Sequence, residues 1–293
     1  MMKSFVLITL IIAFRLSAQD HQHQERVNVV TSVEQIADDK NLPPSEETAK
    51  ARLETSPRHG ELIDVKIAGT NETIRTWIVY PERKDKAPVV IVIHEIYGLT
   101  DWIRGVADQL AKEGYIGVAP DLISGMGPGG GGTESFTSRD DVVKSIRGLS
   151  TEEAVRRMNA VRSWAITLPS ASGKSATVGY CWGGSKSFEY AGAQPELNAA
   201  IVFYGTSPDS SVLAKVKASV LGLYGGDDAR VNATIEPAAA EMKKLGKVYE
   251  TEIYEGAGHG FLRAQGGRDG ANLRATQKAW LRVIAFLKRE LDK

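Results

Sequence analysis

The chain has 293 residues, and its 36 lysine and arginine residues are balanced by 36 aspartate and glutamate residues. This balance gives no support to binding of nucleic acid or of an anionic membrane surface. The single cysteine, Cys181, excludes an intrachain disulfide and a metal site built on several thiolates. We therefore expect no metal, no cofactor and no nucleic-acid partner.

The first 18 residues have the pattern of a signal peptide. Lys3 precedes an apolar stretch from Phe5 to Phe14, and Leu16-Ser17-Ala18 offers a cleavage site before Gln19. The stretch is too short to span a bilayer comfortably. We expect export to the periplasm or the medium, with no stable membrane association after cleavage; an uncleaved anchor is the alternative.

Residues 19–60 are polar and interrupted by prolines, which indicates a linker or N-terminal extension with one short helix near Glu46 to Leu53. From residue 61 to 293, apolar runs of strand length alternate with stretches of helical periodicity. This alternation predicts one α/β domain with a mostly parallel central sheet and helices on both faces. The first two strands, 62–67 and 73–80, are expected to form an antiparallel edge.

The apolar run Pro88–Ile93 predicts a buried strand, and His94-Glu95-Ile96-Tyr97-Gly98 follows it. The end of this strand offers the backbone N–H of Ile96 as an oxyanion donor and Glu95 as a carboxylate near a catalytic centre. A surface charge at the start of a loop is the alternative interpretation of Glu95. A zinc-protease motif is excluded because its second histidine would have to stand at position 98.

A glycine-rich insertion begins at residues 124–133. It formally contains Gly-x-Gly-x-x-Gly, but no helix is expected at its last glycine, so a nucleotide site is not predicted. Because the insertion follows the carboxyl end of a strand, it is either a flap over the site or a surface loop without function.

The run Gly179-Tyr180-Cys181-Trp182-Gly183 reads as Gly-x-Cys-x-Gly, the nucleophile elbow Gly-x-Ser-x-Gly with sulfur in place of oxygen. The nucleophile of an elbow sits on a strained strand-to-helix turn, where side chains at the flanks would crowd the helix against the strand. The apolar run before Cys181 suits a strand, and residues 187–193 can continue as helix. Taken alone, the run fits either a catalytic thiol or an inert buried cysteine.

Two further groups follow in the order of a catalytic triad. Asp227 and Asp228 come after an apolar run at 219–224, and His259 lies between glycines after another predicted strand at 249–254. The carboxyl ends of strands in an open parallel sheet are where catalytic groups collect. Either aspartate could be the acid, and the order of the three signals favours a nucleophilic hydrolase.

The chemistry explains why these residue types are needed. The thiolate is the nucleophile, so the thiol requires a base. A histidine can take the thiol proton and return one to the leaving group, and a buried aspartate fixes the imidazole tautomer. The backbone N–H of Trp182 is expected to be one oxyanion donor and that of Ile96 the other.

Five segments in this order resemble the dienelactone hydrolase family, the cysteine-dependent branch of the α/β-hydrolases, over roughly residues 60–293. They are His94-Glu95-Ile96-Tyr97-Gly98, Ala119-Pro120-Asp121-Leu122, Gly179-Tyr180-Cys181-Trp182-Gly183-Gly184, Gly225-Gly226-Asp227-Asp228 and Ala257-Gly258-His259-Gly260-Phe261.

The resemblance implies the α/β-hydrolase fold and a triad of Cys181, Asp228 and His259. It also implies that Glu95 contacts the thiol and helps to deprotonate it once substrate binds, and that Arg263 holds a substrate carboxylate. A second carboxylate-binding arginine usually follows the Asp-Leu pair in this family, whereas here Gly125 and its neighbours occupy that stretch.

The sequence therefore predicts an enzyme that opens a lactone or cleaves a small carboxylic ester through an acyl-thioester intermediate. A general carboxylesterase with another substrate and a non-catalytic protein that binds a small ligand are the alternatives. Tyr97, Trp182 and Tyr204 are candidates to line the substrate pocket, although aromatic residues near strand ends equally belong to the core.

Overall fold

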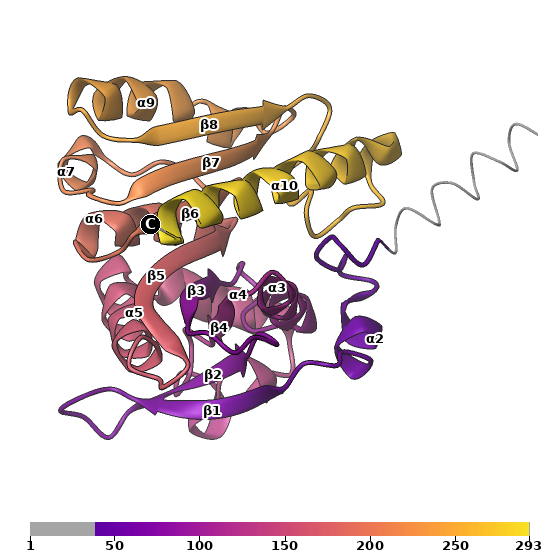
Figure 1. The fold of residues 1–293 in the computed structure, drawn as a ribbon, viewed down its shortest axis with the longest axis vertical. Helices are drawn as coiled ribbons and strands as arrows, with labels where there is room; N and C mark the ends of the chain where they lie inside the picture. Colours follow the sequence, from indigo (N-terminus) through magenta and orange to yellow (C-terminus); the bar gives the residue numbers. More distant parts are fainter. Residues whose placement is uncertain (1–38, 293) are drawn as a thin grey trace, which may run out of the picture. The chain divides into compact units, whose positions relative to one another are not determined.

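The computed structural model describes residues 39–292. The predicted signal peptide at residues 1–18 and the first part of the predicted linker lie outside the described residues. A single eight-stranded sheet with the order β1-β2-β4-β3-β5-β6-β7-β8 forms the centre of the domain (Figure 1). Within residues 39–292, no helix is long and apolar enough to cross a membrane.

The sheet is mixed, with an antiparallel edge and a parallel remainder. β1 (Gly60–Lys66) pairs antiparallel with β2 (Thr73–Val79), which pairs antiparallel with β4 (Ile116–Pro120). All other neighbours are parallel. These strands are β3 (Ala87–Ile93), β5 (Ala171–Tyr180), β6 (Ala199–Phe203), β7 (Ser219–Gly225) and β8 (Tyr249–Tyr254). The predicted fold class and the antiparallel edge are both confirmed.

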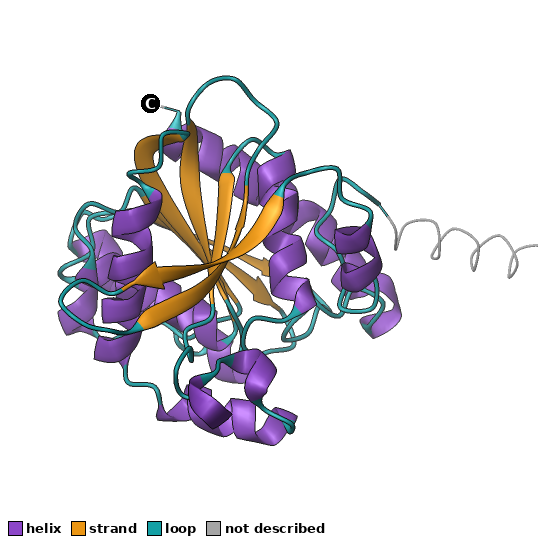
Figure 2. Ribbon diagram, turned by 90° about the horizontal axis from the view of Figure 1, so that it is seen from below, coloured by secondary structure: helices purple, strands orange, loops and turns teal. Residues whose placement is uncertain are grey.

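Helices cover both faces of the twisted sheet (Figure 2). Side chains alternate between the faces along a strand, so Val90 and Val92 of β3 pack in one core cluster and Val89, Ile91 and Ile93 in the other. The first cluster includes residues of α3 (Asp101–Lys112) and α10 (Ala271–Leu291). The second includes residues of α5 (Thr151–Ala165), α6 (Trp182–Ala193), α7 (Ser210–Leu213), α8 (Ala229–Asn232) and α9 (Ile235–Lys244).

Local signals start two of these helices. The Ser150 hydroxyl accepts a hydrogen bond from the Glu153 backbone N–H at 3.1 Å, which caps α5 in the Ser-x-x-Glu pattern. The Thr100 side chain caps α3 in the same way through the Ile103 N–H. Two further helices, α2 (Ala49–Glu54) and α4 (Arg139–Gly148), flank the domain. α2 is the short helix expected in this region, but it begins three residues later than the predicted start at Glu46.

The stretch before β1, predicted as part of a polar linker, packs against the domain. Leu42 is buried, and the carbonyl oxygens of Pro43 and Pro44 accept hydrogen bonds from the buried side chains of Gln265 and Trp102. Residues from Lys40 onward form one compact unit with the rest of the domain. This stretch thus packs on the domain surface, and its backbone carbonyl groups satisfy the buried side-chain donors of Trp102 and Gln265.

Candidate active site

Cys181 lies on a sharp turn between β5 and α6. Its backbone has φ +55° and ψ −114°, in a region that non-glycine residues rarely adopt. A Cβ on Gly179 would lie 1.9 Å from the Gly183 carbonyl oxygen, and a Cβ on Gly183 would lie 2.4 Å from that of Ile93. Both flanks therefore require glycine, and the strand–turn–helix context of a nucleophile elbow is present.

His259 pairs with Asp228. The His259 Nδ1 atom lies 2.5 Å from Oδ2 of Asp228, a buried carboxylate three residues beyond the end of β7. The neighbouring Asp227 is exposed and pairs instead with Arg268 at 2.7 Å. Of the two candidate acids, Asp228 is thus the one that orients the imidazole.

The environment of Cys181 keeps the resting thiol protonated. Burial raises the pKa of Cys181 to about 11, and the negative charges of Glu95 and Asp228 add to this increase. The Trp182 backbone N–H, which hydrogen-bonds to the thiol, acts in the opposite direction. The sulfur therefore lies beside the N–H group predicted as an oxyanion donor, and a base would have to deprotonate it to form a thiolate.

Glu95, at the carboxyl end of β3, is a buried carboxylate with an unusual pKa. Burial raises the pKa of Glu95 to about 7, although the positive charge of Arg263 lowers it in part. Nε of Arg263 lies 2.7 Å from Oε2 of Glu95 as an ion pair without the alignment of a full hydrogen bond. Glu95 is not a solvated surface charge, and it can change protonation state near neutral pH.

Arg263 contacts a second carboxylate that the sequence pattern did not indicate. Its Nη1 donates to Oε2 of Glu46, and Oε1 of Glu46 accepts from Nη2 of Arg139 at 2.7 Å. The Arg139 guanidinium lies 3.9 Å from the centre of the half-buried Tyr97 ring, and that of Arg263 lies 5.5 Å from it. Glu46, Tyr97, Arg139 and Arg263 thus form one cluster, which we call the arginine pair with its Glu46 bridge.

The other candidate residues lie around this centre. Ile96 is half-buried in the loop after β3. Tyr204 is fully buried after β6, where its ring packs 5.1 Å from that of His259 and its φ is +40°. Burial and the charge of Glu95 raise the pKa of Tyr204 well above its usual value. Among residues 39–292, its hydroxyl finds no hydrogen-bond partner. Tyr204 is thus a fully buried residue that packs against the His259 ring.

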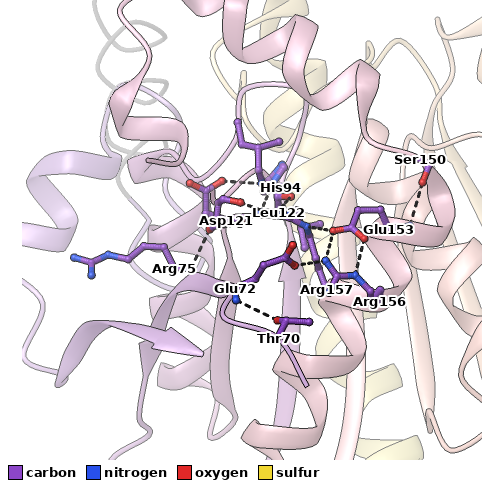
Figure 3. A network of polar contacts seen from close by, with 12 residues as sticks. Thr70, Glu72, Arg75, His94, Asp121, Leu122, Ser150, Glu153, Arg156 and Arg157 are labelled. Carbon is purple, nitrogen blue, oxygen red and sulfur yellow. Dashed lines mark hydrogen bonds and ion pairs between the residues drawn. The ribbon is translucent and has the colours of Figure 1, made fainter. Parts of the chain in front are cut away.

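The polar contacts drawn in Figure 3 include His94 and Leu122, which join the ends of β3 and β4. His94 Nε2 accepts from the Leu122 N–H at 3.2 Å, so Nδ1 carries the proton and donates to the Glu95 carbonyl at 2.7 Å. Burial lowers the pKa of His94, which keeps it neutral. His94 also stacks on Trp182, with ring centres 5.5 Å apart. His94 is therefore structural, and it ties the end of β3 to the end of β4.

The glycine-rich insertion is anchored at both ends. The Ser124 hydroxyl accepts from the Arg75 N–H at 2.9 Å. At the other end, the fully buried Asp121 carboxylate accepts from the Thr133 N–H at 2.6 Å and from its hydroxyl at 2.8 Å. Within residues 39–292, no group of three or more metal-ligating side chains is placed to hold a metal ion.

Comparisons with known proteins agree with this architecture. A family model described as "Dienelactone hydrolase family" matches residues 74–291. A protein of Saccharolobus solfataricus named "Putative carboxymethylenebutenolidase" is 30% identical over 247 residues, which cover 74% of this chain and 94% of that protein. A protein of Escherichia coli K12 with the same name is 28% identical over 221 residues, which cover 71% of this chain and 80% of that protein.

A solved structure supports the same assignment. The crystal structure titled as a "Putative Dienelactone Hydrolase" from Klebsiella pneumoniae superimposes with a TM-score of 0.67 at 26% identity, over 78% of this chain and 98% of that chain. The family resemblance drawn from the five sequence motifs is therefore confirmed. The chain is a hydrolase that belongs to the dienelactone hydrolase family.

Proposed function

We propose that the protein hydrolyses a small carboxylic ester or lactone through a Cys181, His259, Asp228 triad and an acyl-thioester intermediate. The observation that carries the proposal is the pairing of His259 with Asp228 at the same sheet edge as the strained turn of Cys181. Nucleophile, base and orienting acid then follow β5, β8 and β7, respectively, and the carboxyl ends of these parallel strands lie at one edge of the sheet.

In the first half-reaction, the Cys181 sulfur loses its proton and bonds to the carbonyl carbon, while the carbonyl electron pair moves onto oxygen. The N–H groups of Trp182 and Ile96 would stabilise that oxyanion. When the oxyanion collapses, the carbon–oxygen bond to the leaving group breaks, and the leaving alkoxide takes up the proton that the thiol released, from whichever of His259 and Glu95 received it. A lactone leaving group stays attached to the acyl chain.

Glu95 and His259 are the two acceptors for the thiol proton. Transfer from the thiol to an ionised Glu95 leaves the number of negative charges in the buried site unchanged, which favours this route over one that adds a charge. With a pKa of about 7, Glu95 is ionised in part of the population at neutral pH. Transfer to His259 instead forms an imidazolium beside Asp228.

In the second half-reaction, water attacks the thioester carbonyl and loses its proton to His259. The carbon–sulfur bond then breaks, and the carboxylic acid product leaves. The sulfur regains a proton, so that thiol, His259 and Glu95 return to their starting states.

The test compares the wild-type protein with Cys181→Ala on a dienelactone and on a neutral short-chain aryl ester under reducing conditions. We expect Cys181-dependent turnover of at least one substrate and an adduct on Cys181 detected by intact-mass spectrometry during turnover. A far-UV circular dichroism spectrum identical to that of the wild type controls for folding. Equal hydrolysis by Cys181→Ala, or no hydrolysis of either substrate, would overturn the proposal.

We also propose that residues 1–18 direct export of the protein. The pattern of Lys3, the apolar stretch and Leu16-Ser17-Ala18 supports this assignment. Mass spectrometry of the protein from separated cell fractions should find a chain that begins at Gln19 outside the cytoplasm. A full-length chain in the cytoplasmic fraction would contradict it.

A further inference from the structure

Two arginine side chains and two carboxylates meet at the edge of the candidate site. Arg263 lies between Glu95, which is buried, and Glu46, which comes from the segment before the sheet. Arg139, the first residue of α4, approaches Glu46 from the other side at 2.7 Å. The two carboxylates thus compensate the two guanidinium charges when Glu95 is ionised.

The two arginines hold the Glu46 carboxylate in the way that they could hold the carboxylate of a substrate. One of its oxygens contacts Arg139 and the other contacts Arg263. Arginine is suited to such contacts because its planar guanidinium directs several N–H donors at carboxylate oxygens. Partial burial alone would raise the pKa of Glu46, but the hydrogen bonds and charges of the two arginines outweigh it and lower the pKa. Glu46 is therefore a carboxylate anion in this position.

The fold holds Glu46 in place. Its backbone N–H donates to the Arg263 carbonyl at 2.9 Å. The two preceding prolines accept hydrogen bonds from Trp102 and Gln265, each at 2.9 Å and each from a buried side chain. The carboxylate is thus present at the arginine pair at a high effective concentration, and a substrate anion would have to displace it.

We infer that Glu46 is a specificity-determining residue, whose carboxylate fills the arginine pair and makes the enzyme select acyl groups that carry no negative charge there. This inference rests on the proposed ester hydrolysis at Cys181. The inference also gives Arg139 a role, because Arg139 supplies the second carboxylate-binding guanidinium that is missing near Gly125. The carboxylate that the two arginines bind is then that of Glu46.

The test measures selectivity between two matched substrates. One is an aryl ester of adipic acid with a free terminal carboxylate, and the other is its terminal methyl ester. We expect the wild type to prefer the methyl ester in kcat/KM. Glu46→Gln should raise the anionic-to-neutral ratio by about tenfold or more, mainly through KM, because it frees charge-assisted hydrogen bonds for the substrate. Arg139→Gln added to Glu46→Gln should remove part of this gain.

Glu47→Gln is the matched control, because it removes the same charge from the exposed next residue. Its ratio should equal that of the wild type. A ratio in Glu46→Gln that stays within about twofold of the wild type, or a wild type that prefers the anionic ester, would overturn the inference. Such a result with Cys181-dependent turnover intact would leave the proposed function standing.

A binding measurement keeps the inference testable apart from turnover. Hexanoate, a monocarboxylate without an ester bond, should raise the thermal midpoint of Glu46→Gln but not that of the wild type or Glu47→Gln. Equal shifts in all three proteins, or none in Glu46→Gln, would count against a subsite that Glu46 occupies.

Discussion

The buried carboxylate of Glu95 lies 2.7 Å from the Arg263 guanidinium, and its pKa is nevertheless raised to about 7. Desolvation thus outweighs the attraction of a direct ionic partner. A carboxyl group in this condition titrates where most esterases are assayed, so its protonation state should be visible in the kinetics.

The first prediction concerns the pH dependence of activity. If ionised Glu95 accepts the thiol proton, kcat/KM on a neutral ester should rise with pH through about 7. Glu95→Gln should lose most activity and this acidic limb together. A pH–rate profile of both proteins tests the assignment, and an unchanged limb in Glu95→Gln would assign it to another group.

A control for this prediction uses the two charges next to Glu95. Arg263 lowers the pKa of Glu95 and Glu46 raises it. Arg263→Gln should therefore move the limb to higher pH, and Glu46→Gln should move it to lower pH. Shifts of the same sign in both variants would contradict the electrostatic explanation.

The second prediction concerns stability. The folded-state pKa of Glu95 lies above its ordinary value, so the folded protein binds the Glu95 proton more tightly than the unfolded chain. This contribution is fully present below pH 4.5 and is lost as the pH rises through about 7. The free energy of unfolding of the wild type, relative to Glu95→Gln, should fall by up to roughly 3 kcal/mol over this range. Urea unfolding at pH 4.5, 6 and 8 measures the difference, and a pH-independent difference would argue against a buried, titrating Glu95.

The third prediction separates the two adjacent aspartates. Asp228→Asn should lower kcat by about three to four orders of magnitude, because the amide favours the wrong imidazole tautomer. Asp227→Asn removes the same charge one residue earlier, where only the exposed contact with Arg268 is lost, and should retain activity. Steady-state kinetics of the two variants measures this difference. Comparable losses of activity in both would contradict the assignment of Asp228 as the residue that orients His259.

The fourth prediction uses the backbone strain at Cys181. Its φ of +55° suits glycine better than any residue with a Cβ. Cys181→Gly should therefore be more stable than Cys181→Ala by about 1 kcal/mol, while both lack activity. Chemical denaturation of the two variants measures this difference. Equal stabilities would mean that the turn is not strained.

A fifth prediction tests the preference for sulfur. Cys181→Ser should be far less active, because a hydroxyl is a much poorer nucleophile unless its base is well placed. Turnover near that of the wild type would count against thiolate chemistry.

The fold was largely predictable because its signals are local. The apolar run of β3, the glycines around Cys181 and the caps at Ser150 and Thr100 each act within a few residues. The apolar faces of α3 and α5 are buried, as the helical periodicity of this part of the chain predicts. These patterns specify elements, and the parallel order of the strands then brings their carboxyl ends together.

The arginine pair with its Glu46 bridge was not predictable in the same way. Glu46 and Arg139 are ordinary charged residues in polar stretches, and each is far in sequence from Arg263. No spacing rule joins such residues, because their contact depends on how the first segment crosses the domain. Residue spacing alone did not separate Asp227 from Asp228; the family resemblance favoured Asp228, and the structure shows that the two aspartates face different partners.

The hydrogen bonds from Trp102 and Gln265 to Pro44 and Pro43 have a practical consequence for where this domain can be cut. The family match begins at residue 74, inside β2 and after β1. An expression clone trimmed to that boundary would lose the edge strand β1. It would also leave the buried side-chain donors of Trp102 and Gln265 without their carbonyl acceptors. A boundary at Lys40 keeps both, so the compact folded unit is longer than the stretch that the family match covers.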